Sequence, residues 1–146
     1  MSVQCRGDSS RAVRNLRVIV GAVLVVSAVH YADNVVRFDR YIDPADRFGP
    51  TSWIDAGIVA VSWFAFAAAM LGGLWAYERG RISLAALCLA VGASSGLLTL
   101  LHFVEVQPGD MDWFQLVGVA IDFVGGVTLL TAAVWVAWWG PRRTAP

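Results

Sequence analysis

The stretch WFQLVGVAIDFVGGVTLLTAAVWVAWW, residues 113–139, decides the fold class, because it is 27 residues long and carries a single charge, Asp122. A helix needs about 20 predominantly apolar residues to cross the hydrocarbon core of a bilayer. Residues 16–36, 53–77 and 82–104 meet the same requirement, and short polar connectors separate them. The sequence therefore predicts an all-α integral membrane protein, a bundle of four transmembrane helices.

The overall composition agrees with this fold class and argues against some functions. The chain has 146 residues, of which 58% are hydrophobic, and its mean hydropathy is +0.62, well above the usual values for a soluble domain. The formal net charge is zero, so there is no case for a nucleic-acid partner. Cys5 and Cys88 form no CxxC motif, and we expect neither a disulfide nor a thiol-ligated metal.

The arginines are unevenly distributed between the two sides of the predicted bundle. Eight lie before or at the start of the first span, between the second and third spans, or after the fourth, and three lie on the other side. The positive-inside rule assigns the arginine-rich side to the cytoplasm. We therefore expect a multi-pass protein of the plasma or inner membrane, with cytoplasmic tails at residues 1–15 and 140–146. Trp53 and Trp113 then lie at the outer interface, as aromatic belts require.

The first apolar segment has a second interpretation. Arginines followed by a short apolar run and Val26-Ser27-Ala28 also resemble a secretory signal peptide with its cleavage site. Against cleavage, the apolar character continues beyond that point into Val29, Val35 and Val36. We therefore retain the segment as a membrane span.

A short motif occurs twice and predicts a tandem repeat of a two-helix unit. His30-Tyr31-Ala32-Asp33 ends the first span and His102-Phe103-Val104-Glu105 ends the third, so both segments read His-aromatic-x-acid. Trp53 and Trp113 open the two intervening spans. Parallel repeats related by an axis along the membrane normal are a known membrane architecture. The register set by the two tryptophans pairs Asp55 with Gln115 and Ser62 with Asp122.

Polar residues within the spans follow helical spacing. His30, Asp33, Asn34 and Arg37 share one face of the first helix, because positions i, i+3, i+4 and i+7 superpose. A charged side chain at the centre of a bilayer costs about 2.5–3.5 kcal/mol on insertion scales, so such faces turn inward. We therefore expect one polar pocket in the outer half of the bundle. Besides Asp122 and His30, its expected lining is Asp33, Asn34, Arg37, Asp55 and Gln115.

Three classes of function fit a pocket of this kind. The first is a transition-metal or redox-cofactor site, with candidate metal ligands His30, Asp33, His102, Glu105 and Asp122. The second is a membrane-embedded isomerase or cyclase that acts on a lipid or isoprenoid, with Asp122 as the catalytic acid and His30 as the base. The third is a non-catalytic subunit or stability factor, in which the polar cluster only fixes helix packing; transport is a further alternative.

The expected partners are the lipid bilayer and either a lipophilic small molecule or another membrane protein. Several features also have purely structural readings. Asp33 pairs with Arg37 at i+4, Asp55 favours a helix N-terminus, and Gly118, Gly125 and Gly126 are packing positions.

Overall fold

The computed structural model describes residues 2–41 and 54–140, and the side chains of residues 2–9, 41, 104 and 105 fall outside that description. Within the described ranges every regular element is helical, and four helices are long and apolar enough to cross a membrane. In chain order the elements are α1 (Ser2–Val36), α2 (Phe38–Tyr41), α3 (Ala56–Glu78), α4 (Ile82–Leu98), η2 (Thr99–Leu101), α5 (His102–Glu105) and α6 (Trp113–Trp139).

The helix bounds agree with the predicted spans to different degrees. The stretch at residues 113–139 coincides with α6. The stretch at 82–104 is α-helical only as far as Leu98, after which a 3-10 turn and the short helix α5 complete it. Helix α1 begins at Ser2 and thus runs through the predicted tail, whereas Trp53 lies outside the described residues.

Aspartate side chains begin two of the long helices. Asp55 caps α3, where its carboxylate accepts a hydrogen bond from the Ile58 backbone N–H at 2.8 Å. Asp112 caps α6 in the same way through Gln115 N–H at 2.9 Å, and the Gln115 side chain accepts from Asp112 N–H at 3.0 Å, which completes a capping box. Such caps satisfy backbone donors that a helix start leaves open and contribute about 1 kcal/mol each.

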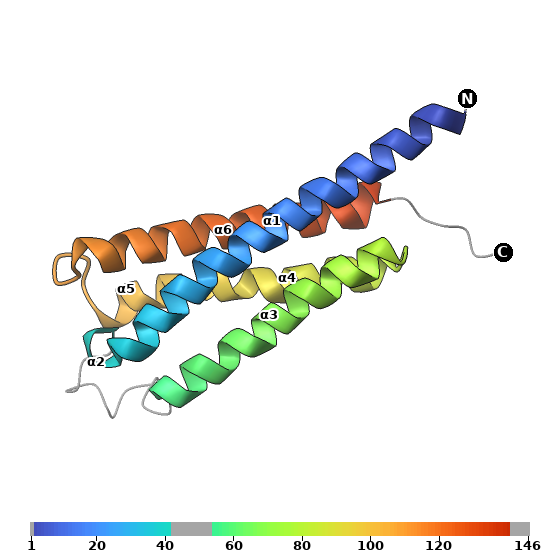
Figure 1. Cartoon of the computed structure of the whole chain (residues 1–146). Coiled ribbons are helices and arrows are strands. Elements are labelled where there is room, and N and C mark those ends of the chain that lie inside the picture. Colours follow the sequence, from blue (N-terminus) through green and yellow to red (C-terminus); the bar gives the residue numbers. More distant parts are fainter. Residues whose placement is uncertain (1, 42–53, 141–146) are drawn as a thin grey trace.

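The four long helices form a ring in which α1 packs against α3 and α6, and α4 packs against the same two helices. The start of α1 and the end of α6 lie at one end of the bundle, and α2 and α5 lie at the other (Figure 1). We call the half that contains α2, α5 and the start of α6 the distal half, and the opposite half the proximal half.

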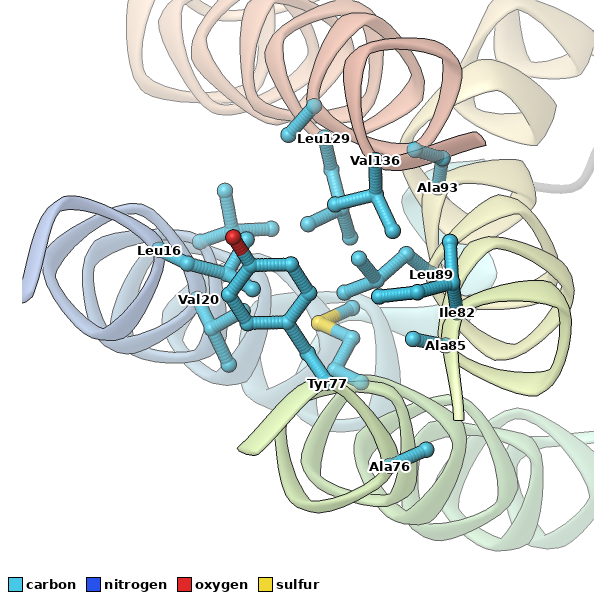
Figure 2. Packing of buried hydrophobic residues seen from close by; sticks show 14 residues of the cluster. Leu16, Val20, Ala76, Tyr77, Ile82, Ala85, Leu89, Ala93, Leu129 and Val136 are labelled. Atoms are coloured by element: carbon cyan, nitrogen blue, oxygen red, sulfur yellow. The ribbon is translucent and has the colours of Figure 1, made fainter. Parts of the chain in front are cut away.

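The proximal half is filled by apolar side chains from all four long helices (Figure 2). Leu16 and Val20 come from α1, Tyr77 from α3, Leu89 from α4 and Val136 from α6, and all are buried. Most buried polar side chains lie farther along, toward the distal half: Ser27, His30, Asn34, Ser95, Thr99, Gln115 and Asp122. The bundle is therefore divided along its length into an apolar and a polar half.

Two glycines bring α4 and α6 into backbone contact at the boundary between these halves. A Cβ added at Gly96 would collide with the Asp122 carbonyl oxygen, and one added at Gly126 would lie 2.9 Å from the Ala93 carbonyl oxygen. Small residues allow membrane helices to approach this closely. The packing role predicted for Gly126 agrees with this contact.

We expect Gly96→Ala and Gly126→Ala each to lower the free energy of unfolding in detergent by about 1–3 kcal/mol, because the added methyl group forces the two backbones apart. Gly72→Ala is the matched control, since nothing lies within 4 Å of its added Cβ; it should be neutral or stabilise by up to about 1 kcal/mol. Equal effects at Gly72 and Gly96, measured by reversible unfolding followed by circular dichroism, would contradict this packing.

Candidate functional site

The two histidines of the repeated motif meet in the distal half of the bundle. His30 comes from α1 and His102 from α5, which continues the line of α4. Their ring centroids lie 5.4 Å apart, with the ring planes at 75°. His30 is buried, with 3% of its surface exposed, and His102 is half-buried. Helices at opposite corners of the ring therefore contribute one imidazole each to a shared position.

Asn34 joins the two rings. Its Nδ2 atom lies 3.3 Å from His30 Nε2 and 3.2 Å from His102 Nε2. An amide NH2 group carries two hydrogens, so it donates to both rings when each imidazole is neutral and protonated at Nδ1. Both Nε2 lone pairs then point toward one place, the position of the Asn34 amide nitrogen.

Helix α6 passes close to this pair because Gly118 has no side chain. A Cβ added at Gly118 would lie 3.2 Å from His30 Nδ1, tighter than ordinary van der Waals contact. The imidazole thus occupies space that any larger residue would take. Gly118 was expected to be a packing position only, and the structure makes it part of the wall around His30.

Ion pairs among Asp33, Arg37, Arg40 and Asp112 cover the distal end of the bundle, and we call this group of residues the roof. Arg37 Nε lies 3.0 Å from Asp33 one turn earlier on α1, and Arg37 Nη1 lies 3.1 Å from Asp112 at the start of α6. Arg40 reaches the same Asp112 oxygen at 3.2 Å, and the Arg37 guanidinium lies 5.3 Å from the centroid of the Phe114 ring. The roof therefore ties α1 and α2 to α6.

The neighbours of Asp112 favour the ionised form of its carboxyl. The hydrogen bond from the Gln115 backbone lowers the pKa of its carboxyl most, and the charges of Arg37 and Arg40 lower it further. A carboxyl whose pKa is lowered by folding stabilises the folded state above its ordinary pKa, and that contribution is lost as the pH falls through the lowered value. The roof therefore persists at neutral and mildly acidic pH.

Asp122 occupies a different position from the histidine pair. It is fully buried on α6, and neither carboxylate oxygen has a hydrogen-bond partner among the described residues. Tyr31 of α1 lies within electrostatic range of Asp122 and is hydrogen-bonded to the Ser62 side chain of α3. Tyr31 thus relates Asp122 of α6 to Ser62 of α3, apart from the histidine pair.

Sequence reasoning placed Thr99 on the polar face of His102, but it missed Tyr31 and Ser27 as pocket residues and did not see that a hydroxyl precedes both histidines. Ser27 Oγ donates to the Leu24 carbonyl at 3.3 Å, and Thr99 Oγ1 donates to the Gly96 carbonyl at 2.6 Å. Each hydroxyl stands three residues before its histidine, so the repeated motif begins earlier, as Ser/Thr-x-x-His. Comparing the residues before both histidines would have revealed it. Ser27 also accepts a hydrogen bond from Trp63 Nε1 at 3.2 Å.

The predicted pocket residues are only partly brought together. Asn34 lies between the histidines, Asp33 and Arg37 belong to the roof, and Gln115 is buried beneath it in the α6 capping box. Asp55 is exposed, caps α3 and has no contact with the histidines among the described interactions. The Glu105 side chain lies outside the described part of the chain. Within that part, no three His, Cys, Asp or Glu side chains gather closely enough to hold a metal ion.

Comparison with protein-family models, with curated proteins and with solved structures finds no significant match to this chain.

The unpartnered carboxyl of Asp122 makes a direct prediction about stability. A buried polar group without a hydrogen bond costs about 1–3 kcal/mol, and leucine keeps the branching of aspartate at Cγ without its polar atoms, although its side chain is larger. We expect Asp122→Leu to raise the free energy of unfolding in detergent by about that amount. Asp122→Asn is the matched control, because it keeps a polar amide and should change stability much less. A loss of stability in the leucine variant would show that the carboxyl has a partner.

Proposed function

We propose that this chain is a membrane protein with four spans whose outer half binds a divalent first-row transition-metal ion between His30 and His102. The observation that carries the proposal is the convergence of both Nε2 lone pairs on one atom position, 3.2 and 3.3 Å away. Neutral imidazole is the form in which histidine binds metals, and it suits zinc, copper, iron and nickel.

The ion would take the place of the Asn34 amide NH2 group. The Asn34 side chain would have to draw back from that position, and with its amide turned by half a rotation Oδ1 would face the ion as a third ligand atom. Metal–imidazole bonds are about 2.0–2.1 Å long, so each ring has to move toward the ion by about 1 Å. On the α6 side His30 faces Gly118, which has no side chain to hold the ring in place.

Two imidazoles and one amide leave part of the coordination sphere to water or a substrate. Sites that keep an open position are typical of catalytic metals, whereas structural sites use four protein ligands. The proposed ion is therefore one that acts on or senses a small ligand. Asp33 forms an ion pair with Arg37 in the roof, and this argues against the predicted role of Asp33 as a metal ligand.

The proposed metal site also fits the predicted tandem repeat, in which α1 and α3 correspond to α4 and α6. Helices α1 and α4 each pack against both α3 and α6, as a twofold axis along the bundle requires, and the two histidines would lie next to that axis. Asn34 has no counterpart, because Val106 occupies the equivalent position; one amide therefore serves both rings. The helix caps favour pairing Asp55 with Asp112 over the predicted pairing of Asp55 with Gln115.

We expect the purified full-length chain to bind one Cu²⁺ ion whose electron paramagnetic resonance spectrum shows coupling to two imidazole nitrogens. His30→Gln and His102→Gln should each leave one coupled nitrogen and weaken binding by more than about tenfold, since losing even an outer-shell partner costs about 10- to 100-fold. The control is Cys5→Ser combined with Cys88→Ser, which removes both thiols and should leave the spectrum unchanged. An unaltered spectrum in both histidine variants would exclude this site.

The placement of the site in the outer half follows from the arginine distribution and has its own test. A reporter fused after Pro146 should be active only in its cytoplasmic form, and one inserted next to Pro44 only in its external form. The opposite result at both positions would reverse the orientation and move the histidines to the cytoplasmic half. Inactivity of both forms in the membrane fraction would contradict the membrane placement itself.

A second candidate function is acid–base chemistry on a lipophilic substrate, and Asp122 is the observation that favours it. A buried carboxyl within electrostatic range of Tyr31, which is itself hydrogen-bonded to Ser62, is an arrangement that can pass a proton to a bound molecule. If the metal experiment fails and Asp122→Asn alone abolishes activity on an isoprenoid or lipid substrate, this function replaces the first.

A further inference from the structure

The connector between α3 and α4 carries two arginines on a tight turn in the proximal half. Gly80 adopts a left-handed conformation with φ 72°. The Gly80 N–H donates to the Tyr77 carbonyl and the Arg81 N–H donates to the Ala76 carbonyl, both at 2.9 Å. These two bonds define a Schellman motif, which needs a residue that tolerates positive φ at the position of Gly80. The turn therefore fixes where the backbones of Arg79 and Arg81 lie.

Both guanidinium groups lie over one indole. The Arg79 Cζ atom is 4.3 Å from the centroid of the Trp75 ring, and the Arg81 Cζ atom is 5.3 Å from it. Trp75 is 43% exposed on the outside of the bundle. Cation–π contacts hold each arginine in a preferred position without neutralising its charge. Two positive groups are thus kept side by side on the surface of the bundle.

The neighbouring acid does not neutralise this pair. Glu78 precedes Arg79 directly, but its carboxylate accepts from Arg17 Nε of α1 at 2.8 Å. That ion pair links α1 to α3 and uses the charge of Glu78. Within the described residues, no salt bridge involves Arg79 or Arg81. The turn therefore presents two positive charges beside an aromatic ring at the end of two predicted spans.

We propose that Arg79, Arg81 and Trp75 form a binding site for the phosphate of an anionic phospholipid headgroup. The inference rests on the proposed membrane placement and is independent of the metal site. A guanidinium offers paired N–H donors that match phosphate oxygens, and two of them surround one phosphate. Trp75 belongs to the aromatic belt at the level of the headgroups, so the phosphate and the arginines lie at the same depth.

The experiment measures lipid binding to the full-length chain by native mass spectrometry, with phosphatidylglycerol as the probe and phosphatidylcholine as the reference. We expect phosphatidylglycerol to bind preferentially, and Arg79→Gln combined with Arg81→Gln to weaken this binding by about tenfold or more, since each basic residue near an anionic headgroup contributes roughly 1 kcal/mol. The matched control is Arg11→Gln combined with Arg14→Gln, which removes the same charge from exposed positions on α1 and should cost less than about threefold.

A second double variant separates geometry from charge. Arg79→Lys with Arg81→Lys keeps the net charge and the topology signal, but lysine lacks the planar fork; we expect binding to weaken by about fivefold. Equal binding of both lipids, equal losses in the two glutamine variants, or full binding in the lysine variant would each overturn the proposal. Tighter binding of cardiolipin than of phosphatidylglycerol would support it and show that two phosphates are held.

The same preparations distinguish this inference from the proposed metal function. If a chain shows no lipid preference but keeps the copper spectrum with two coupled nitrogens, the lipid site at the α3–α4 turn is wrong and the metal site stands. A chain that carbonate extracts from the membrane fraction would instead contradict the membrane placement on which both proposals stand.

Discussion

A polar group placed between apolar helices has to find its partner inside the bundle, and this constraint organises the distal half of the structure. Asn34 meets it by lying between two imidazoles. Ser27 and Thr99 meet it by returning their hydroxyls to carbonyls of their own helices, as hydroxyls in apolar helices commonly do. Only the Asn34 contact fixes how α1 is rotated relative to α5, because the hydroxyl bonds lie within one helical segment and turn with it. A buried polar group left without a partner costs about 1–3 kcal/mol.

The packing of the proximal half holds the four long helices in place, and the polar contacts of the distal half depend on this. Apolar side chains of all four long helices fill it, and the close approach of α4 and α6 at Gly96 and Gly126 fixes the separation of these two helices. Between apolar helices in a bilayer, such contacts would act through dispersion and shape, since lipid is as apolar as the side chains. The glycine contact includes the backbone of Asp122 itself. The position of that carboxyl is therefore set by main-chain packing and not by a polar partner.

The sequence was sufficient for those features that depend on local pattern. Span lengths, the Asp33–Arg37 pair and the inward faces follow from apolar length and helical periodicity, and the repeated motif indicated that His30 and His102 belong together. It was insufficient where a partner comes from another helix. Nothing in the spacing along α1 shows that Asn34 reaches His102, that Arg37 and Arg40 meet Asp112, or that Asp55 stays at the surface. These contacts depend on how each helix is rotated and where α4 gives way to a 3-10 turn.

The contrast between the histidine pair and Asp122 separates two kinds of polar site in one bundle. The Nε2 atoms of the histidines share a donor, so their arrangement is stable without any ligand and changes only if something binds more strongly than an amide. A metal ion meets that condition, because metal–imidazole bonds exceed a neutral hydrogen bond in strength. Asp122 has no such internal solution among the described residues, and the other contacts of the fold have to offset the cost of its burial. The histidine pair is thus satisfied within the bundle, whereas the Asp122 carboxyl is not. Both positions involve α1 and α6, so the rotation of these two helices determines both at once.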